Sequence, residues 1–341
     1  MKNLEIRNKI KGKKIVCLAG GTGTSVVLFG LKKYPIDITA IVSMADSGGS
    51  NRIIRDEFGL LPTSDIRQCL VALSEEKSES DSLLRKLFMY RFSRGRGTKG
   101  MTFGNLFLAA LADIFGSQEE AIEKTSQVLK IKGRVLPVTF TDSNLVAFYE
   151  NGKKVVCEHF IDEPRHDGRL KIKRAYLKPK SKANPEAVKA LLEADLIVIG
   201  PGDLYTSLVV NLLVKGIVEA LQKTKAKMVY ILSLMTRYGQ TFGFTAQDHI
   251  HTLEKHLGKN CLNFVLVNSR PISKADLKKY ERENEFPVID DLEDNYFKII
   301  RGDFLSEKET KKVAGDILKR SLIRHDSNKL AKAIINLCRP R

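Results

Sequence analysis

The feature that most constrains this fold is a series of short, almost continuously apolar runs, each followed by a turn signal and a helical pattern. The clearest runs are Ile15–Ala19, Ile38–Met44, Leu196–Ile199, Met228–Leu232 and Phe264–Val267. Because these runs lack the alternation of a half-exposed strand, we expect strands buried on both faces, as in a parallel sheet covered by helices. The sequence therefore predicts the α/β class.

Helical patterns and one contrasting segment complete this organisation. The helices are expected at Ile66–Leu73, Asn105–Ile114, Glu119–Leu129 and Asn184–Glu193. Residues 133–178 alternate instead and contain the hairpin-like turn "ENGK". We expect this segment to be a small antiparallel insertion or edge of one domain spanning 13–341. Residues 1–12 are expected to form a basic, flexible extension.

Composition indicates the cellular environment in which we expect the protein. The chain has 341 residues and is 43% hydrophobic, which is enough for a sizeable core. No stretch approaches the ~18 apolar residues of a membrane span, so we expect no membrane insertion. No apolar signal-peptide segment follows the basic N-terminus. Five scattered cysteines form no C-x-x-C pair, which favours a reduced, cytoplasmic protein.

The net charge of +17 attracts polyanions in general. The basic residues are spread along the whole chain, however, and no RNP motif, zinc-finger spacing or basic heptad region is present. Nucleic acid is therefore not expected to be the main partner. A small phosphorylated ligand is the alternative partner for the positive charge.

The first candidate ligand loop is "LAGGTGTS", directly after the first apolar run. Its glycines allow close backbone approach and its hydroxyls can bind phosphate, as can the N–H groups of the helix that follows. The candidates are Gly20, Gly21, Thr22, Gly23 and Thr24. The third glycine of a dinucleotide fingerprint is replaced by Val26, so another phosphate cradle and a simple tight turn both remain open.

Four further segments carry small polar residues after predicted strands or at helix starts. In "SMADSGGS", Asp46 could accept from a sugar hydroxyl, or the segment could only cap a helix. Asp65 either caps its own helix or faces the ligand. The candidates from these four segments, two of which are later loops, are Asp46, Gly48, Gly49, Ser50, Asp65, Gly202, Thr206, Ser207 and Thr236. Because strand ends of a parallel sheet meet at one edge, we expect these loops to converge.

Several chemistries fit poorly. The chain has no G-x-x-x-x-G-K-[ST] loop, no G-x-S-x-G elbow and no H-E-x-x-H pattern. The segment "AQDHIHTLEKHL" is interpreted as an amphipathic helix and not as a zinc site. No residue is assigned to a metal.

A series of motifs in fixed order carries a specific resemblance. They are "LAGGTGTSVVLFGLKKYPIDITAIVSMADSGGS", "TSDIRQCLVALS", "FGNLFLAAL", "GRVLP", "ADLIVIGPGDLYTSLVVNLL", "SLMTRYGQTFGFTAQDH", "VLVNSRPI" and "LIRHDSNKLAKAI". Together they resemble the CofD-like superfamily, and most closely its YvcK branch, the gluconeogenesis factors. The resemblance runs from about residue 13 to 338 and implies a Rossmann-like three-layer α/β/α fold.

The resemblance implies two activities. The YvcK branch binds UDP-sugars such as UDP-N-acetylglucosamine and is linked to carbon metabolism and cell shape, with Tyr280 and Arg324 matching its ligand-binding positions. The CofD branch transfers a phospholactyl group from a guanylylated donor to a deazaflavin alcohol with magnesium. There Asp65 matches the residue at the acceptor, and Asn105 matches the same cleft.

We therefore expect a regulatory protein that binds a UDP-sugar or another nucleoside diphosphate, with magnesium as an optional companion of the diphosphate. A CofD-like transferase, in which Asp65 would be catalytic, is the alternative, and an NAD-dependent oxidoreductase is disfavoured. A homodimer and regulatory protein partners are compatible with the sequence. Two departures from the family pattern are Ser47, where a second acid is usual, and Asp203, where a small residue is usual.

Overall fold

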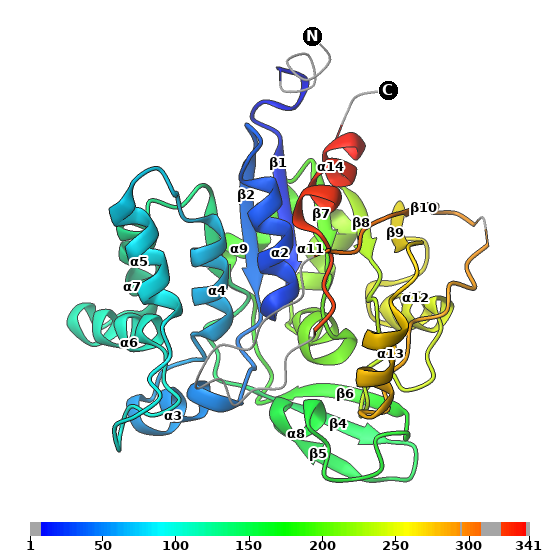
Figure 1. The fold of residues 1–341 in the computed structure, drawn as a ribbon, viewed down its shortest axis with the longest axis horizontal. Coiled ribbons are helices and arrows are strands. Elements are labelled where there is room, and N and C mark those ends of the chain that lie inside the picture. Colours follow the sequence, from blue (N-terminus) through cyan, green and yellow to red (C-terminus); the bar gives the residue numbers. More distant parts are fainter. Residues whose placement is uncertain (1–7, 294, 308–321, 339–341) are drawn as a thin grey trace.

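The apolar runs form strands of one sheet in the computed structural model, which describes residues 8–293, 295–307 and 322–338. The order is β10-β9-β8-β7-β1-β2-β3, and every neighbouring pair is parallel (Figure 1). The strands are β1 (Lys14–Ala19), β2 (Asp37–Val42), β3 (Arg134–Pro137), β7 (Leu196–Ile199), β8 (Lys227–Ile231), β9 (Phe264–Asn268) and β10 (Lys298–Gly302).

Helices cover both faces of this sheet because successive strand residues point to opposite sides. In β1, Val16 and Leu18 belong to one core cluster, and Ile15 and Cys17 belong to the other. The first cluster includes residues of α9 (Pro185–Leu192), α11 (Ile217–Lys223) and α12 (Ala246–Leu257). The second includes residues of α2 (Gly21–Leu31), α4 (Ser64–Leu73) and α14 (Ser327–Leu337). The predicted three-layer α/β/α class is confirmed.

A long helical segment, which lies beside the sheet, connects β2 to β3 (Figure 1). In addition to α4 it contains α3 (Gly49–Phe58), α5 (Glu79–Met89), α6 (Phe103–Phe115) and α7 (Gln118–Val128). Of these, α3 and α5 were not among the expected helices, although both are amphipathic. Each is held by packing against neighbouring helices, α3 against α6 and α5 against α4 and α6.

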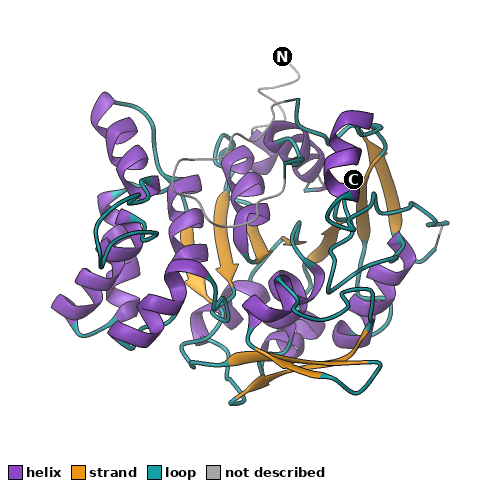
Figure 2. Cartoon of the chain, turned by 60° about the horizontal axis from the view of Figure 1, so that its bottom comes forward, coloured by secondary structure: helices purple, strands orange, loops and turns teal. Residues whose placement is uncertain are grey.

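The small antiparallel sheet lies below the carboxyl ends of the main strands (Figures 1 and 2). Its order is β5-β4-β6, with β4 (Asn144–Tyr149), β5 (Lys154–Val156) and β6 (Ile172–Lys178), and the short helix α8 (Glu158–Asp162) belongs to it. The expected start at 133 is wrong, because β3 pairs parallel with β2 and buries Val135 in the main core. The antiparallel part begins at β4.

The remaining elements are the π-helix η1 (Leu204–Val209), α10 (Val210–Leu212) and α13 (Lys274–Glu281). Of the predicted flexible extension, residues 1–7 lie outside the described residues. Residues 8–12 differ from the expectation, because Ile10 is fully buried in the core and Gly12 N–H donates to Pro35 O at 3.0 Å. No helix in the described part of the chain is long and apolar enough to cross a membrane.

The crossing of α2 and α14 depends on one glycine. A Cβ on Gly30 would overlap the carbonyl oxygen of Ser327 and lie 2.8 Å from the Cβ of Ala331. We therefore expect Gly30→Ala to lower the free energy of unfolding by about 1–3 kcal/mol, because the two helices must separate. Gly97→Ala is the matched control, since no atom lies within 4 Å of an added Cβ there. Urea unfolding of both variants checks this, and equal midpoints would contradict it.

Candidate functional site

A cavity of about 280 Å³ lies at the carboxyl ends of the central strands. β1 is the point where the strand order reverses, because the chain runs from β1 towards β2 on one side and from β7 towards β8 on the other. Open α/β sheets bind ligands at this position. The loops after β1, β2, β7 and β8 all line the cavity, together with α8 and the segment 323–325.

The loop after β1 leads into α2, whose first residue is Gly21 and whose N-cap residue Gly20 provides no side-chain cap. The loop after β7 leads into η1, whose first-turn N–H groups at Tyr205 and Thr206 already donate to Gln240 Oε1, both at 3.3 Å. Unsatisfied first-turn N–H groups bind anions, and the helix dipole adds to this attraction. The start of α2 therefore offers such N–H groups to the cavity. Gly23 lets the loops after β1 and β7 approach one another, because a Cβ there would overlap the carbonyl of Pro201.

The same cavity is also lined by carboxylates, which would repel an anion. Burial raises the pKa of Asp65 to about 7, with a further contribution from Asp46, and burial raises the pKa of Asp203 to about 6. Burial also raises the pKa of Asp46 and of Glu158, and their neighbouring carboxylates add to the effect. The cavity thus concentrates negative charge that a proton or a cation must offset.

The loop after β2 is shaped by Asp46 itself. Its Oδ1 accepts from Gly48 N–H at 2.9 Å, and its Oδ2 accepts from the Asn51 amide at 2.6 Å. The Asn51 Oδ1 in turn accepts from the backbone N–H groups of Thr63 and Ser64, both at 3.1 Å. Asp46 therefore fixes the start of α3 and, through Asn51, the start of α4, while it still lines the cavity.

Asn105 does not line the cavity but supports its wall. It is fully buried, and its Oδ1 accepts from Arg67 Nε at 2.9 Å. Its amide donates to Ser50 Oγ at 2.9 Å and to Ser64 Oγ at 3.1 Å. Asn105 is therefore a positioning residue that holds two cavity-lining hydroxyls and the buried Arg67.

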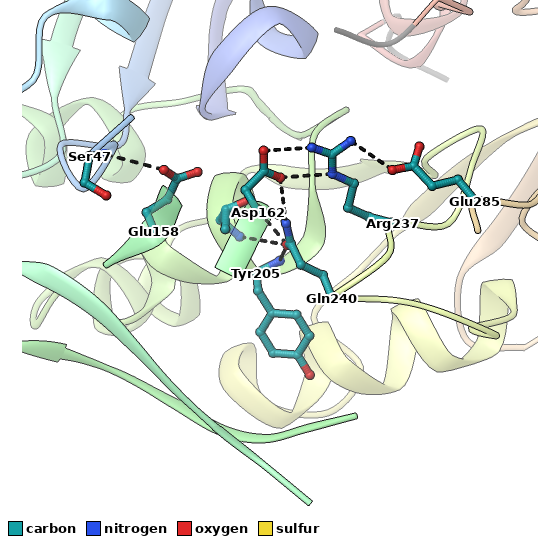
Figure 3. Close-up of polar contacts among 8 residues, drawn as sticks. Ser47, Glu158, Asp162, Tyr205, Arg237, Gln240 and Glu285 are labelled. Atoms are coloured by element: carbon teal, nitrogen blue, oxygen red, sulfur yellow. Dashed lines mark hydrogen bonds and ion pairs between the residues drawn. The ribbon is translucent and has the colours of Figure 1, made fainter. Parts of the chain in front are cut away.

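An arginine clamp fixes the antiparallel insertion to the main sheet (Figure 3). Arg237 donates through Nε and Nη2 to the two oxygens of Asp162, at 3.0 and 2.7 Å, and through Nη1 to Glu285 at 2.9 Å. Asp162 also accepts from Gln240 Nε2 at 3.1 Å. Gln240 Oε1 accepts from the backbone N–H groups of Tyr205 and Thr206, both at 3.3 Å. The clamp thus links α8 to the first turn of η1.

Ser47 occupies the position where a second acid is usual in the resembling family. Its Oγ accepts from His159 N–H at 3.0 Å, and its own N–H donates to Glu158 Oε2 at 3.4 Å. Ser47 thereby docks the beginning of α8. The carboxylate that Ser47 lacks is supplied to the same cavity by Glu158 from the insertion.

Tyr280 and Arg324 both line the cavity although they are far from the glycine loops in sequence. Tyr280 is only 6% exposed, and its hydroxyl accepts from Ile323 N–H at 3.0 Å. This bond anchors the backbone directly before Arg324. Tyr280 therefore contributes to the position of Arg324 in addition to lining the cavity.

Most predicted site residues meet at this cavity. Those that line it are Gly20, Gly21, Thr22, Gly23, Asp46, Gly48, Ser50, Asp65, Gly202, Thr206, Ser207, Thr236, Tyr280 and Arg324. Gly49 and Asn105 are outside the lining, and Thr24 is fully buried, with Oγ1 donating to Gly20 O at 3.3 Å. Lining residues not assigned to the site from sequence include Arg67, Glu158, Asp162, Asp203, Arg237 and Glu285.

The donor set suits magnesium, which the resemblance implies for the transferase branch. Mg²⁺ prefers oxygen ligands and is usually held by one or two carboxylates together with phosphate oxygens of a ligand. Asp46, Asp65 and Glu158 are the carboxylates that would hold it. Within the described residues, no three His, Cys, Asp or Glu side chains are already grouped to hold a metal. A bound phosphate would therefore have to complete the coordination.

Comparison with known proteins agrees with this fold. The family model of "2-phospho-L-lactate transferase CofD" matches residues 15–305, and the chain belongs to the CofD family. Within it, the chain is 40% identical to the "Gluconeogenesis factor" of Bacillus subtilis over 95% of this chain and 98% of that protein. The Halalkalibacterium halodurans "Gluconeogenesis factor" is also 40% identical, over 96% and 97%. The predicted YvcK-like assignment is confirmed.

A solved structure supports the same relationship. A crystal structure of a Bacillus halodurans protein described as a member of the upf0052 family has a TM-score of 0.85 and 38% sequence identity to this chain. The similarity covers 96% of this chain and 99% of that one.

The raised pKa of Asp65 makes stability depend on pH. Because its folded pKa of about 7 exceeds the ordinary value of 3.8, the stability that it confers is present below pH 4 and is lost as pH rises through 7. Asp65→Asn should therefore be more stable than the parent at pH 8, by about 1–3 kcal/mol, with a smaller difference at pH 5. Urea unfolding at both pH values checks this. The exposed Asp56→Asn is the control, and a pH-independent difference for Asp65→Asn would contradict the account.

The arginine clamp gives a second prediction. Arg237→Met leaves the carboxylates of Asp162 and Glu285 without their cation in a mostly buried setting. We expect a loss of about 3–5 kcal/mol in the free energy of unfolding. The exposed pair of Arg169 and Asp167 is the comparison, and Arg169→Met should cost less than about 1 kcal/mol. Equal losses in chemical denaturation would show that the clamp is not a stabilising contact.

Proposed function

We propose that this chain is a regulatory protein that binds a nucleotide sugar, a UDP-sugar such as UDP-N-acetylglucosamine, and connects its level to carbon metabolism and cell shape. The observation that carries this proposal is that the uncapped start of α2 and Arg324 line the same cavity. Backbone N–H groups and a guanidinium are the donors that diphosphates prefer. The relatives named gluconeogenesis factors support a regulatory output.

In this proposal each group of residues that lines the cavity has one role in ligand binding. The first turn of α2 donates to the diphosphate, and Arg324 neutralises part of its charge. Asp46 accepts from a ribose or sugar hydroxyl. Tyr280 contacts the nucleotide, and its hydrogen bond with Ile323 keeps Arg324 in place. Magnesium, when bound with the diphosphate, supplies positive charge that offsets the buried carboxylates.

A transferase reaction of the CofD type is the second candidate, and the raised pKa of Asp65 favours it. A carboxyl group with a pKa near neutral pH can accept a proton from an alcohol. Asp65 lines the cavity beside the α2 loop, where it could orient an acceptor hydroxyl. In this candidate the cavity binds a guanylylated donor in place of a UDP-sugar.

Thermal-shift titration in the presence of magnesium distinguishes these candidates. UDP-N-acetylglucosamine at saturation should raise the unfolding temperature by roughly 3–8 °C, whereas GDP and NAD should not. Arg324→Ala should lose this shift because a diphosphate contact is removed. Arg282→Ala, which removes an exposed arginine of the segment after α13, should keep it.

The other outcomes of this titration are equally informative. A shift with GDP and none with the UDP-sugar would support the transferase candidate and overturn the nucleotide-sugar proposal. A shift with NAD alone would contradict both. A shift with the UDP-sugar that survives in Arg324→Ala would contradict the assigned role of Arg324.

A further inference from the structure

A second cavity, of about 240 Å³, lies between β6 and α12, away from the cavity at the strand ends. Four cationic residues line it, and one carboxylate does. The cations are Lys171, Lys173, Arg174 and Lys255, and the carboxylate is Asp248. Tyr205, Phe244 and Thr252 form buried parts of the lining. Positive charge and a partly aromatic lining are thus combined in one concave site.

The cations are not neutralised by protein carboxylates. Across residues 8–293, 295–307 and 322–338, none of the four forms an ion pair, and Lys255 Nζ donates to the carbonyl of Lys173 at 3.2 Å instead. The single carboxylate, Asp248, is engaged elsewhere, because it accepts from Thr245 N–H at 3.1 Å in the capping box of α12. Lys171 lies over the ring of Phe244 at 5.8 Å and Arg174 over that of Tyr176 at 5.4 Å, so these cations are offset by aromatic rings, a carbonyl, solvent and salt, and by no ion pair within the described residues.

A backbone irregularity lies at the edge of the cavity. Phe148 pairs with Arg174 and Tyr149 pairs with Ile172, so Lys173 is an extra residue in β6. Lys173 and Arg174 are both exposed and both line the cavity, and the Arg174 guanidinium lies over the ring of Tyr176 at 5.4 Å. Bulges are frequent next to functional sites. The bulged carbonyl of Lys173 is the one that accepts from Lys255.

The second cavity shares a wall with the first. Tyr205 of η1 lines the second cavity, and its hydroxyl donates to the carbonyl of Ile172 at 3.4 Å. The next residues of η1, Thr206 and Ser207, line the first cavity. π-Helices are rare in proteins, and those that occur are frequently found at functional sites. The same element therefore contacts both cavities.

We propose that the cavity between β6 and α12 is a second ligand site, which binds a small phosphorylated metabolite carrying at least two negative charges. The cations, which form no ion pair within the described part of the chain, attract the phosphates, and the concave surface with Tyr205 and Phe244 accommodates a compact organic part. An extended polyanion would contact only the rim of a cavity of this size.

The chain contains no tryptophan, so a single introduced indole reports on one place. His251→Trp places it at the exposed rim of the second cavity. Titration of the full chain with inorganic pyrophosphate, at low salt and with chloride matched for ionic strength, should give a saturable fluorescence change. Lys173→Ala/Lys255→Ala in this background should weaken the apparent affinity at least about tenfold, because two charged contacts are lost. The control Lys223→Ala/Lys225→Ala removes the same charge outside both cavities and should not.

The Arg324→Ala background separates this site from the first cavity. The fluorescence change should persist there, because Arg324 lines only the first cavity. A change that disappears in Arg324→Ala would overturn the second site and support diphosphate binding in the first cavity. No saturable change at millimolar pyrophosphate, or equal weakening by the two double variants, would also overturn the proposal.

Discussion

The structure depends on the place of β1 between β2 and β7. Parallel hydrogen bonding on both sides brings the carboxyl ends of three strands together, and the reversal of strand order leaves an opening between their loops. The loops after β1 and β7 can meet there only because Gly23 has no side chain where the Pro201 carbonyl lies. Every later feature of the cavity is built on that close approach.

The cavity combines the start of α2 with buried carboxylates, and the proposed function has to satisfy both. In that proposal the α2 start and Arg324 attract a phosphate group, whereas Asp65 and Glu158 repel it unless a proton or a cation intervenes. A ligand that brings a diphosphate with a divalent cation would satisfy both halves. The antiparallel insertion belongs to the site for the same reason, since α8 contributes Glu158 and is secured by the contacts of Arg237 with Asp162.

The sequence predicted the parts of the molecule that local patterns encode. The buried strands and the loops after them were found because apolar runs and glycine clusters are local signals, and parallel pairing then places those loops together. The helices α3 and α5 were missed although both are amphipathic. The edge strand β3 was assigned to the wrong sheet, because its parallel pairing with β2 is a tertiary contact that its own segment does not record. Ile10 was missed for a similar reason, since one apolar residue in a basic segment does not reveal the core that receives it.

The site was predicted less completely than the fold. Tyr280 and Arg324 came from family resemblance, because an amphipathic-helix tyrosine and a lone arginine carry no local signal. Asp162 and Glu158 lie in the antiparallel insertion. The hairpin turn predicted that this insertion exists, but it does not predict which part of the main sheet the insertion packs against. Asn105 was expected at the cleft but supports it from behind, a distinction that depends on side-chain orientation.

A crystal structure of the chain with UDP-N-acetylglucosamine and magnesium tests the central claim most directly. The account predicts the diphosphate against the first turn of α2, with Arg324 within hydrogen-bond distance of a phosphate oxygen and the cation between that phosphate and the carboxylates of Asp46 and Asp65. A nucleotide sugar bound elsewhere, or a diphosphate that contacts neither the α2 loop nor Arg324, would contradict it.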